Sequence, residues 1–302
     1  MPLRPFTDDD ARELPPGFLL VLSARSGAGK STIVQHILSL PSMRGRFASA
    51  VVVSPTSMLA GKTPTQFACV PAGLHYRGDQ LTEVIDKVVA AQKKARQAGR
   101  MGEVLIVADD IFGSVRGGQG QTNTRFLEFI STRRHWGGGC AIICIQQHLK
   151  CLAPSVRAQV SAFMASRPLT YNDRRCIMEW FLCRKTIDGS KKKTMEEASR
   201  ILDECYAVNP YAFLFVNAAS KEQEVRDTVR VALVPNGGKV RDFRLRFAVP
   251  KITGQSSKED PTINDVRRSV QTEDAGQDGA AQDDAAADAG FELDLGPLTG
   301  QR

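Results

Sequence analysis

The stretch VLSARSGAGKST, residues 21–32, decides the fold of this chain. Apolar residues lead up to Leu22, a short turn follows, and Gly29, Lys30 and Ser31 then open the helical pattern STIVQHILSL. A glycine-rich turn between a strand and a helix that ends in Gly-Lys-Ser is a P-loop. Its backbone N–H groups and the positive end of the helix cradle phosphate oxygens, so the stretch predicts binding of a nucleoside triphosphate.

Each residue of this loop has an expected part in the site. Lys30 reaches the β- and γ-phosphates, and the Ser31 hydroxyl is a ligand for Mg²⁺. Ala24 stands where the strict pattern has glycine, and because it adds only a methyl group, a phosphate cradle with a slightly altered turn is expected. An ordinary glycine-rich turn is the simpler alternative, but the strand before it and the helix after it argue against that. The expected nucleotide-binding residues are Ala24, Arg25, Ser26, Gly27, Ala28, Gly29, Lys30, Ser31 and Thr32.

Length and composition are those of a globular protein. The chain has 302 residues, of which 42% are apolar, so one or two domains with a sizeable core are expected. No apolar run approaches the roughly 18 residues that span a bilayer, and the N-terminal sequence MPLRPFTDDD lacks the features of a signal peptide. The seven cysteines show neither CxxC pairs nor zinc-site spacing, which indicates reduced thiols in an intracellular protein.

The charges are divided between a basic body and an acidic tail. The whole chain has a net charge of +7, but residues 254–302 contain four basic and eleven acidic residues, so the body has a net charge of +14. A domain with this charge predicts a polyanionic partner, DNA or RNA, although a generally basic, solvated surface is the simpler alternative. The tail has few large apolar residues, which predicts disorder. Its last stretch, FELDLGPL, is either a docking patch or only the end of the tail.

Strand and helix patterns alternate through the body. Expected strands cover residues 18–23, 48–57, 103–110, 140–147, 160–166, 212–216, 228–234 and 242–249, and expected helices cover 30–40, 80–97, 124–135, 170–184 and 194–206. Such alternation is typical of an α/β fold with a mostly parallel sheet and helices on both faces. Together with the P-loop it predicts a P-loop NTPase domain of the RecA/ASCE type over residues 15–253, after an N-terminal extension over 1–14 and before the disordered tail over 254–302.

A second motif, VLIVADD at residues 104–110, carries two acids at the end of a strand. In such folds it places Asp109 and Asp110 at the carboxyl end of a central strand, beside the P-loop. Asp109 is expected to hold Mg²⁺, and Asp110 to orient or deprotonate the attacking water. The run ASAVVVSPTS fills the room for an inserted strand between the two motifs, and Gln146 or Gln147 is expected near the γ-phosphate. No NKxD guanine-reading motif is present, which favours ATP.

The chain resembles the genome-packaging ATPases of nucleocytoplasmic large DNA viruses and their smaller relatives, virophages and polinton-like elements, in five runs: SGAGKS, VVVSPTS, VLIVADD, RRHWGGGCAIICIQQ and LAPSVRAQVSAFMAS. This family belongs to the FtsK–HerA superfamily of DNA pumps, and the resemblance covers about residues 15–220. It depends most on Asp109–Asp110, on Arg134–His135, and on Gln147 followed ten residues later by Arg157. The resemblance implies a homo-oligomeric ring, usually a hexamer, that hydrolyses ATP with Mg²⁺ and drives double-stranded DNA into a preformed capsid.

The resemblance also implies roles for single residues. Arg157 is the implied arginine finger, supplied to a neighbouring subunit. Arg133 and Arg134 compete for that role, and a surface ion pair is the simpler role for all three. The implied partners are double-stranded DNA, further copies of the chain and a capsid or portal-vertex protein, in the host-cell cytoplasm, a viral factory or the virion. The implied catalytic residues are Lys30, Asp110, Gln147 as the phosphate sensor and Arg157, and the implied metal ligands are Ser31 and Asp109.

Two questions stay open at the level of sequence. The glycine-rich stretch 111–125, with Arg116 and Arg125, is either a mobile loop that contacts DNA in the pore of a ring or an ordinary surface loop. The function is either that of an ATP-driven DNA translocase or that of a nucleotide-switched assembly protein that binds nucleic acid without moving it. A nucleotide kinase is disfavoured because no arginine-rich lid sequence is present.

Overall fold

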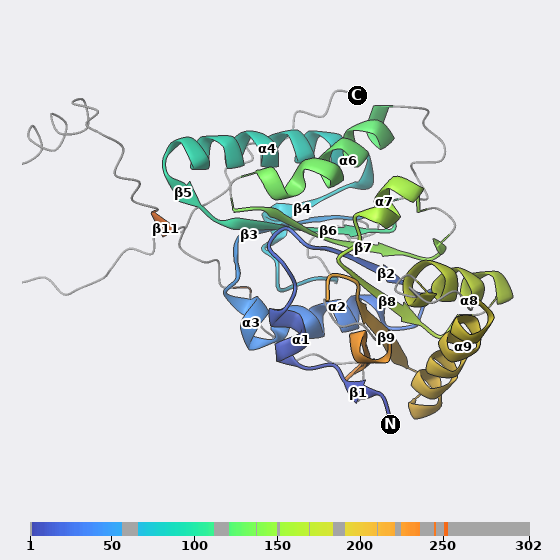
Figure 1. Ribbon diagram of the computed structural model, residues 1–302. Helices are drawn as coiled ribbons and strands as arrows, with labels where there is room; N and C mark the ends of the chain where they lie inside the picture. The colour runs from blue at the N-terminus through green and yellow to red at the C-terminus, as the bar shows by residue number, and fades with distance from the viewer. Residues whose placement is uncertain are drawn as a thin grey trace, which may run out of the picture.

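A nine-stranded sheet organises the part of the chain that the structure describes. The structure is a computed structural model, and it describes residues 2–55, 66–111, 121–136, 138–149, 152–168, 170–183, 191–209, 211–220, 225–235, 245 and 251–252. Within these residues the strands follow the order β1-β10-β9-β8-β2-β7-β6-β3-β4. Helices lie on both faces of the sheet (Figure 1), so the expected α/β architecture is confirmed.

The sheet is parallel over most of its width. Six neighbouring strands run in one direction, namely β8 (Ala162–Ser166), β2 (Leu19–Ser23), β7 (Cys140–Gln146), β6 (Glu103–Asp109), β3 (Phe47–Val53) and β4 (His75–Tyr76). Beyond β8, the strand β9 (Ala212–Asn217) runs antiparallel to both β8 and β10 (Val229–Leu233), and β1 (Arg4–Pro5) pairs in parallel with β10. The first residues of the chain are therefore attached to the edge of the main sheet.

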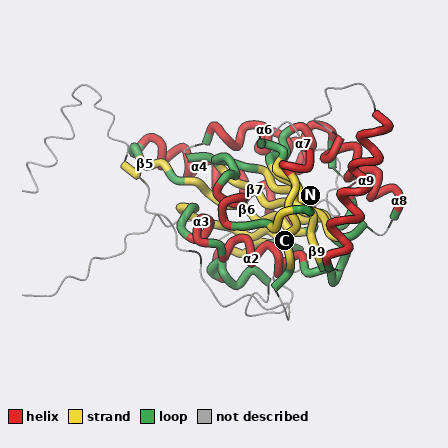
Figure 2. Tube along the Cα trace, turned by 60° about the horizontal axis from the view of Figure 1, so that its bottom comes forward, coloured by secondary structure: helices red, strands yellow, loops and turns green. Residues whose placement is uncertain are grey.

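Two layers of helices cover the sheet (Figure 1). One face carries α4 (Leu81–Gln97), α6 (Gln121–Thr132), α7 (Pro154–Ala158), α8 (Tyr171–Ile177) and α9 (Lys191–Val208), and the other carries α1 (Asp8–Arg12), α2 (Lys30–Ser39) and α3 (Pro41–Arg44). Short 3-10 helices cover Ala72–Leu74, Gly78–Gln80, Arg133–His135 and Val225–Thr228. A separate pair, β5 (Arg100–Met101) with β11 (Lys251–Ile252), lies at the end opposite α8 and α9 (Figure 2).

The central strands are apolar on both faces because helices cover both. Along β2, Leu19 and Val21 pack into the core shared with α4 and α6, while Leu20 and Leu22 pack into the core shared with α2. Buried parallel strands of this kind read as continuous apolar runs rather than as an alternation of apolar and polar residues. This explains why the sequence pattern located the strands so closely.

The order of the strands in the sheet differs from their order in the sequence. The run that contains β3 lies between the P-loop strand and the acidic strand in the sequence, but in the sheet β3 pairs with the far side of β6. The strand inserted between β2 and β6 is β7, which pairs with both. Since the strands are parallel, the end of β7 lies between the P-loop and the acidic pair. The two motifs are therefore neighbours across one strand, not direct neighbours.

Smaller differences concern single segments. Pro154 begins the short helix α7, and the helix expected over 170–184 continues past α8 as a π-helical turn, Met178–Leu182. None of the six described cysteines forms a disulfide, and Cys151 lies outside the described residues. Two further expectations also lie outside them: the tail 254–302, and the strand over 242–249 apart from Leu245.

Candidate nucleotide-binding site

The loop between β2 and α2 has the backbone that its sequence predicts. Gly27 and Gly29 have φ angles of +76° and +87°, in the left-handed region that favours glycine, and α2 begins directly afterwards at Lys30. A Cβ atom on Gly29 would also lie 3.2 Å from Cγ2 of Val234, the residue that follows β10. Position 29 therefore needs glycine both for its backbone conformation and for the space around it.

The unusual alanine of the loop is explained by its surroundings. Ala24 is not among the residues with positive φ, so its backbone does not call for glycine. Its N–H donates to the carbonyl oxygen of Gln146 at 3.0 Å, which continues the pairing of β2 with β7 by one residue. Its methyl group is 3% exposed and belongs to the core on the α2 side of the sheet. Alanine thus fits a loop that begins in extended conformation.

Asp109 ends β6 in a nearly closed environment. Its side chain is 6% exposed and accepts a hydrogen bond from the Ser54 hydroxyl at 3.2 Å. Burial raises the pKa of Asp109 above its ordinary value, while the Lys30 ammonium and the Ser54 hydroxyl oppose that rise. The structure therefore brings Lys30 of the P-loop and Asp109 together. Ser54 was not singled out from the sequence, although its place directly after the apolar run of β3 was a signal that could have found it.

Asp110 follows in a strained conformation. Its φ angle is +52°, which is uncommon for a residue other than glycine, and its N–H donates to the carbonyl oxygen of Ile145 at 2.9 Å. Its Oδ2 accepts a hydrogen bond from Nε2 of Gln147 at 3.0 Å. Backbone strain of this kind persists where the surroundings over-determine it, and it is concentrated at functional sites.

The two neighbouring glutamines have different surroundings. Gln147 is exposed and bound to Asp110, whereas Gln146 is 2% exposed and its side-chain amide has no hydrogen-bond partner among the described residues. Alternation along β7 places Gln146 on the same face as Cys144, which packs in the core shared with α4 and α6. Of the two glutamines that the sequence left open, Gln147 is therefore the one bound to the Asp110 carboxylate.

The oxygen donors at this edge fit magnesium. Mg²⁺ prefers hard oxygen ligands and is held by one or two carboxylates together with substrate phosphates rather than by an all-protein cage. The buried carboxylate of Asp109 and the half-buried hydroxyl residue Ser31 are donors of this kind. Within the described residues no cluster of three or more His, Cys, Asp or Glu could hold a metal ion by itself. The donor set fits an ion shared with phosphate groups.

The candidate arginine fingers lie in three different settings. Arg133 is 0% exposed and donates to the carbonyl oxygens of Gly17, Ile130 and Gln159, and burial, with a smaller contribution from Arg134, lowers its pKa to about 10. It is therefore a structural residue of the opposite edge of the sheet. The exposed Arg134 donates to the Ser161 hydroxyl at 3.2 Å. The guanidinium of Arg157 on α7 lies 3.9 Å from the centre of the Trp180 ring.

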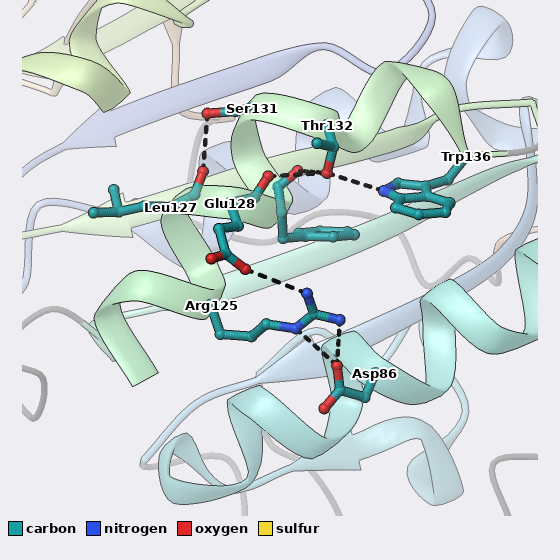
Figure 3. Close-up of polar contacts among 8 residues, drawn as sticks. Asp86, Arg125, Leu127, Glu128, Ser131, Thr132 and Trp136 are labelled. Carbon is teal, nitrogen blue, oxygen red and sulfur yellow. Dashed lines mark hydrogen bonds and ion pairs between the residues drawn. The ribbon is translucent and has the colours of Figure 1, made fainter. Parts of the chain in front are cut away.

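Arg125 is not part of a loop. It lies within α6 and forms an ion pair with Asp86 on α4, its Nε and Nη2 atoms lying 2.8 and 2.6 Å from one carboxylate oxygen (Figure 3). Its Nη1 also lies 3.4 Å from Glu128. Arg116 and the rest of the stretch 112–120 lie outside the described residues. The helix begins earlier than expected and engages Arg125 in a contact between two helices of the same subunit.

Comparisons with models of known protein families and with curated proteins give no match. Among solved structures, the chain is similar to the DNA-packaging ATPase B204 of Sulfolobus turreted icosahedral virus, with 15% identity and a TM-score of 0.45 over 72% of this chain and 97% of that chain. The chain is also similar to the genome packaging NTPase B204 of Sulfolobus turreted icosahedral virus 2 in complex with ATP-gammaS, with 17% identity and a TM-score of 0.44 over 72% of this chain and 98% of that chain. A third similar structure, ATPases 2 and 3 of EssC from Geobacillus thermodenitrificans, has 12% identity and a TM-score of 0.42 over 64% of this chain and 44% of that chain.

At these identities and TM-scores, the similarities carry no conclusion about the function of this chain. None of the helices in the described ranges is long and apolar enough to cross a membrane.

Proposed function

We propose that this chain is an ATPase that couples hydrolysis to the movement of double-stranded DNA into a preformed capsid. The observation that supports hydrolysis is the meeting of Lys30, Asp109 and the bonded pair Asp110–Gln147 at one edge of the sheet. A binding site alone would need the P-loop but no half-buried carboxylate held beside it with a positive φ, as Asp110 is. This edge of the sheet has both the P-loop and such a carboxylate.

Binding of the triphosphate falls to the P-loop. The N–H groups between Ala24 and Lys30 surround the phosphates, and the Lys30 ammonium neutralises charge on the β- and γ-groups. Ser31 and Asp109 would hold Mg²⁺, which when bound supplies positive charge to the same oxygens. The Ser54 hydroxyl donates to Asp109 and so fixes the orientation of its carboxylate.

Asp110 is the proposed catalytic carboxylate. In hydrolysis the oxygen of a water molecule attacks the γ-phosphorus, and Asp110 orients that water and accepts its proton. The amide of Gln147 donates to Asp110, which keeps the carboxylate in one place. When a γ-phosphate is present, the same amide can turn toward it, so that the state of Asp110 depends on the phosphate.

The cargo and the assembly rest on the resemblance in sequence. The basic body of the chain suits a DNA partner, and the proposed ring, a hexamer, would bring Arg157 of one subunit to the nucleotide of the next. A capsid or portal-vertex protein is the proposed docking partner. In the single subunit Arg157 lies over Trp180, so it has to leave that ring or take the ring with it to reach another subunit.

The test is ATP turnover with and without double-stranded DNA, together with a mass measurement in the presence of ATP. We expect DNA to increase turnover and ATP to favour a ring, and Lys30→Ala to abolish both nucleotide binding and turnover. A monomer whose turnover ignores DNA would contradict the motor. If Asp110→Asn stops turnover but ATP-dependent assembly still occurs, the result supports a nucleotide-switched assembly protein instead of a motor.

A further inference from the structure

A cavity of about 240 Å³ lies beside the beginning of the P-loop. It forms where three parallel strands end side by side, because Ser23 of β2 pairs with Gln146 of β7 on one side and with Ala165 of β8 on the other. The wall is built from the residues that follow these strands and from α8. Its lining includes Ser23, Arg25, Gln147, Ser166, Arg167 and Asp173.

Two arginines in this wall differ from most others in the described part of the chain. Arg25 and Arg167 are exposed, and their side chains have no ion pair, hydrogen bond or ring contact there. Most of the other described arginines have at least one such side-chain contact; Arg12 and Arg175, for example, are also exposed but pair with carboxylates one turn away. The two unpaired guanidinium groups therefore line the same cavity, next to the phosphate loop.

The cavity wall neutralises this charge only in part, because it holds two guanidinium groups and one carboxylate. Among its described lining residues the one carboxylate is Asp173, and that group accepts the Thr170 hydroxyl at 2.6 Å while the Asp173 N–H donates back to the Thr170 oxygen at 3.1 Å. Hydroxyl groups of Ser23 and Ser166 add possible donors. Guanidinium and hydroxyl groups together are the usual donors for a phosphate ion, which guanidinium binds through two parallel hydrogen bonds.

The position of the cavity identifies the end of the nucleotide that it adjoins. It touches the first residues of the loop and Gln147, whose amide binds the proposed catalytic carboxylate Asp110. It is not lined by α2, which follows the loop. A cavity at this place adjoins the γ-phosphate and the attacking water rather than the nucleoside.

We propose that this cavity receives the orthophosphate ion cleaved from the nucleotide, and that Arg167, with Arg25, holds it before release. The proposal rests on the function proposed above. In that reaction the bond from water oxygen to the γ-phosphorus forms, the bond from that phosphorus to the bridging oxygen breaks, and the electron pair leaves with ADP. Orthophosphate is the second product, and the cavity has room for about eight water volumes, enough for the ion with part of its hydration shell.

The first experiment measures orthophosphate binding by calorimetry to the full chain saturated with ADP and Mg²⁺. We expect one site, and Arg167→Ala should weaken it by about tenfold or more, because a hydrogen-bonded pair of charges is lost. Arg175→Ala is the matched control. Arg175 is an exposed arginine on α8, and its guanidinium is paired with Glu179. Equal orthophosphate affinity in the two variants would overturn the proposal.

The second experiment separates this cavity from the P-loop, which itself binds anions. Orthophosphate is titrated into Lys30→Ala protein without nucleotide, with and without Arg167→Ala. Binding that survives Lys30→Ala and is lost with Arg167→Ala supports the cavity. Binding that is lost with Lys30→Ala and ignores Arg167 places phosphate in the P-loop only and overturns it.

The two proposals can fail separately. If the wild type binds no ADP, the proposed nucleotide site is wrong, and that is read before any orthophosphate is added. Short duplex DNA is titrated into the same variants. If Arg167→Ala weakens DNA binding and leaves orthophosphate binding unchanged, the cavity contacts nucleic acid and is not a site for the cleaved phosphate.

Discussion

The two ends of the parallel strands are built in opposite ways. We call the side of the sheet where these strands begin the amino edge and the side where they end the carboxyl edge. At the amino edge, both backbone groups of Gly17 are bound by charged side chains, the N–H by Glu103 at 2.6 Å and the carbonyl oxygen by Arg133 at 2.8 Å. Arg46 binds the same Glu103 at 2.6 Å and also donates to two backbone carbonyl oxygens. Charge is buried here, and each buried group has several partners.

At the carboxyl edge the polar groups have fewer partners. Gln146 has a buried amide with none among the described residues, and Arg25 and Arg167 are unpaired there. Burying the unpaired Gln146 amide is costly, so this edge gives up stability there, while the two exposed arginines stay open to a bound ligand. The contrast teaches that the same fold holds itself together at one edge and keeps binding capacity at the other. Substitutions should therefore affect stability at one edge and turnover at the other.

The largest expected effect is at the carboxyl edge. Asp110→Asn should lower turnover by about 10²–10⁴-fold, because the variant cannot accept a proton from water. Asparagine tolerates the left-handed backbone of this position, so the melting temperature should stay close to that of the wild type. Steady-state turnover and thermal unfolding check the two halves of this prediction. A large fall in melting temperature would show that the carboxyl edge also supports the fold.

The next effect is at the amino edge. Arg46→Ala leaves the carboxylate of Glu103 buried without its ion-pair partner, and we expect the free energy of unfolding to fall by about 3–5 kcal/mol. Turnover per folded molecule should not change. Denaturant unfolding and turnover at a temperature where the variant is folded provide the measurement. Arg12→Ala, which breaks only exposed pairs, is the control and should cost at most about 1 kcal/mol.

A smaller effect with the opposite sign is expected at Asp109. Burial raises the pKa of Asp109, so the ionised form destabilises the folded state at pH values above that pKa. Asp109→Asn should therefore raise the free energy of unfolding at neutral pH by about 1 kcal/mol while removing the proposed metal ligand. The gain should shrink as the pH falls through the folded-state pKa, because the wild-type side chain then becomes neutral too. Denaturant midpoints at neutral pH and at the lowest pH where the wild type is folded test this; a gain that grows on acidification would refute it.

The smallest effect is expected away from both edges, at Arg125. Its ion pairs with Asp86 and Glu128 are exposed, so Arg125→Ala should cost about 0.5 kcal/mol of stability. Because the guanidinium is engaged between α4 and α6, stimulation of turnover by DNA should be unchanged. Loss of that stimulation in the variant would instead make this surface a DNA contact.

The sequence predicted the architecture well because its strands are buried. Short continuous apolar runs such as those of β6 and β7 are typical of strands covered on both faces, and the Gly-Lys-Ser sequence identifies the turn between β2 and α2. The order of strands in space was less accessible, since nothing local in β7 says that it pairs with both β2 and β6. Strand order depends on contacts between residues far apart in the chain.

The site was predicted in part for the same reason. Lys30 and Asp109 come from motifs with fixed positions, and the structure brings them together. Ser54 and Arg167 were missed because a serine or an arginine after an apolar strand is common, and only pairing across strands shows what it faces. Arg133 was weighed as a finger because sequence cannot show that a guanidinium is buried among carbonyl groups.

The contact between Gly29 and Val234 has a consequence for the order in which the protein matures. The phosphate loop lies near the beginning of the chain, yet the residue that packs on it follows β10, near the end of the described part. During synthesis the loop is made early, and most of the chain has to follow before Val234 can pack against it. A nascent chain that already contains the whole motif still lacks the finished pocket, so the earliest part of the sequence to be recognised is among the last parts of the molecule to be completed.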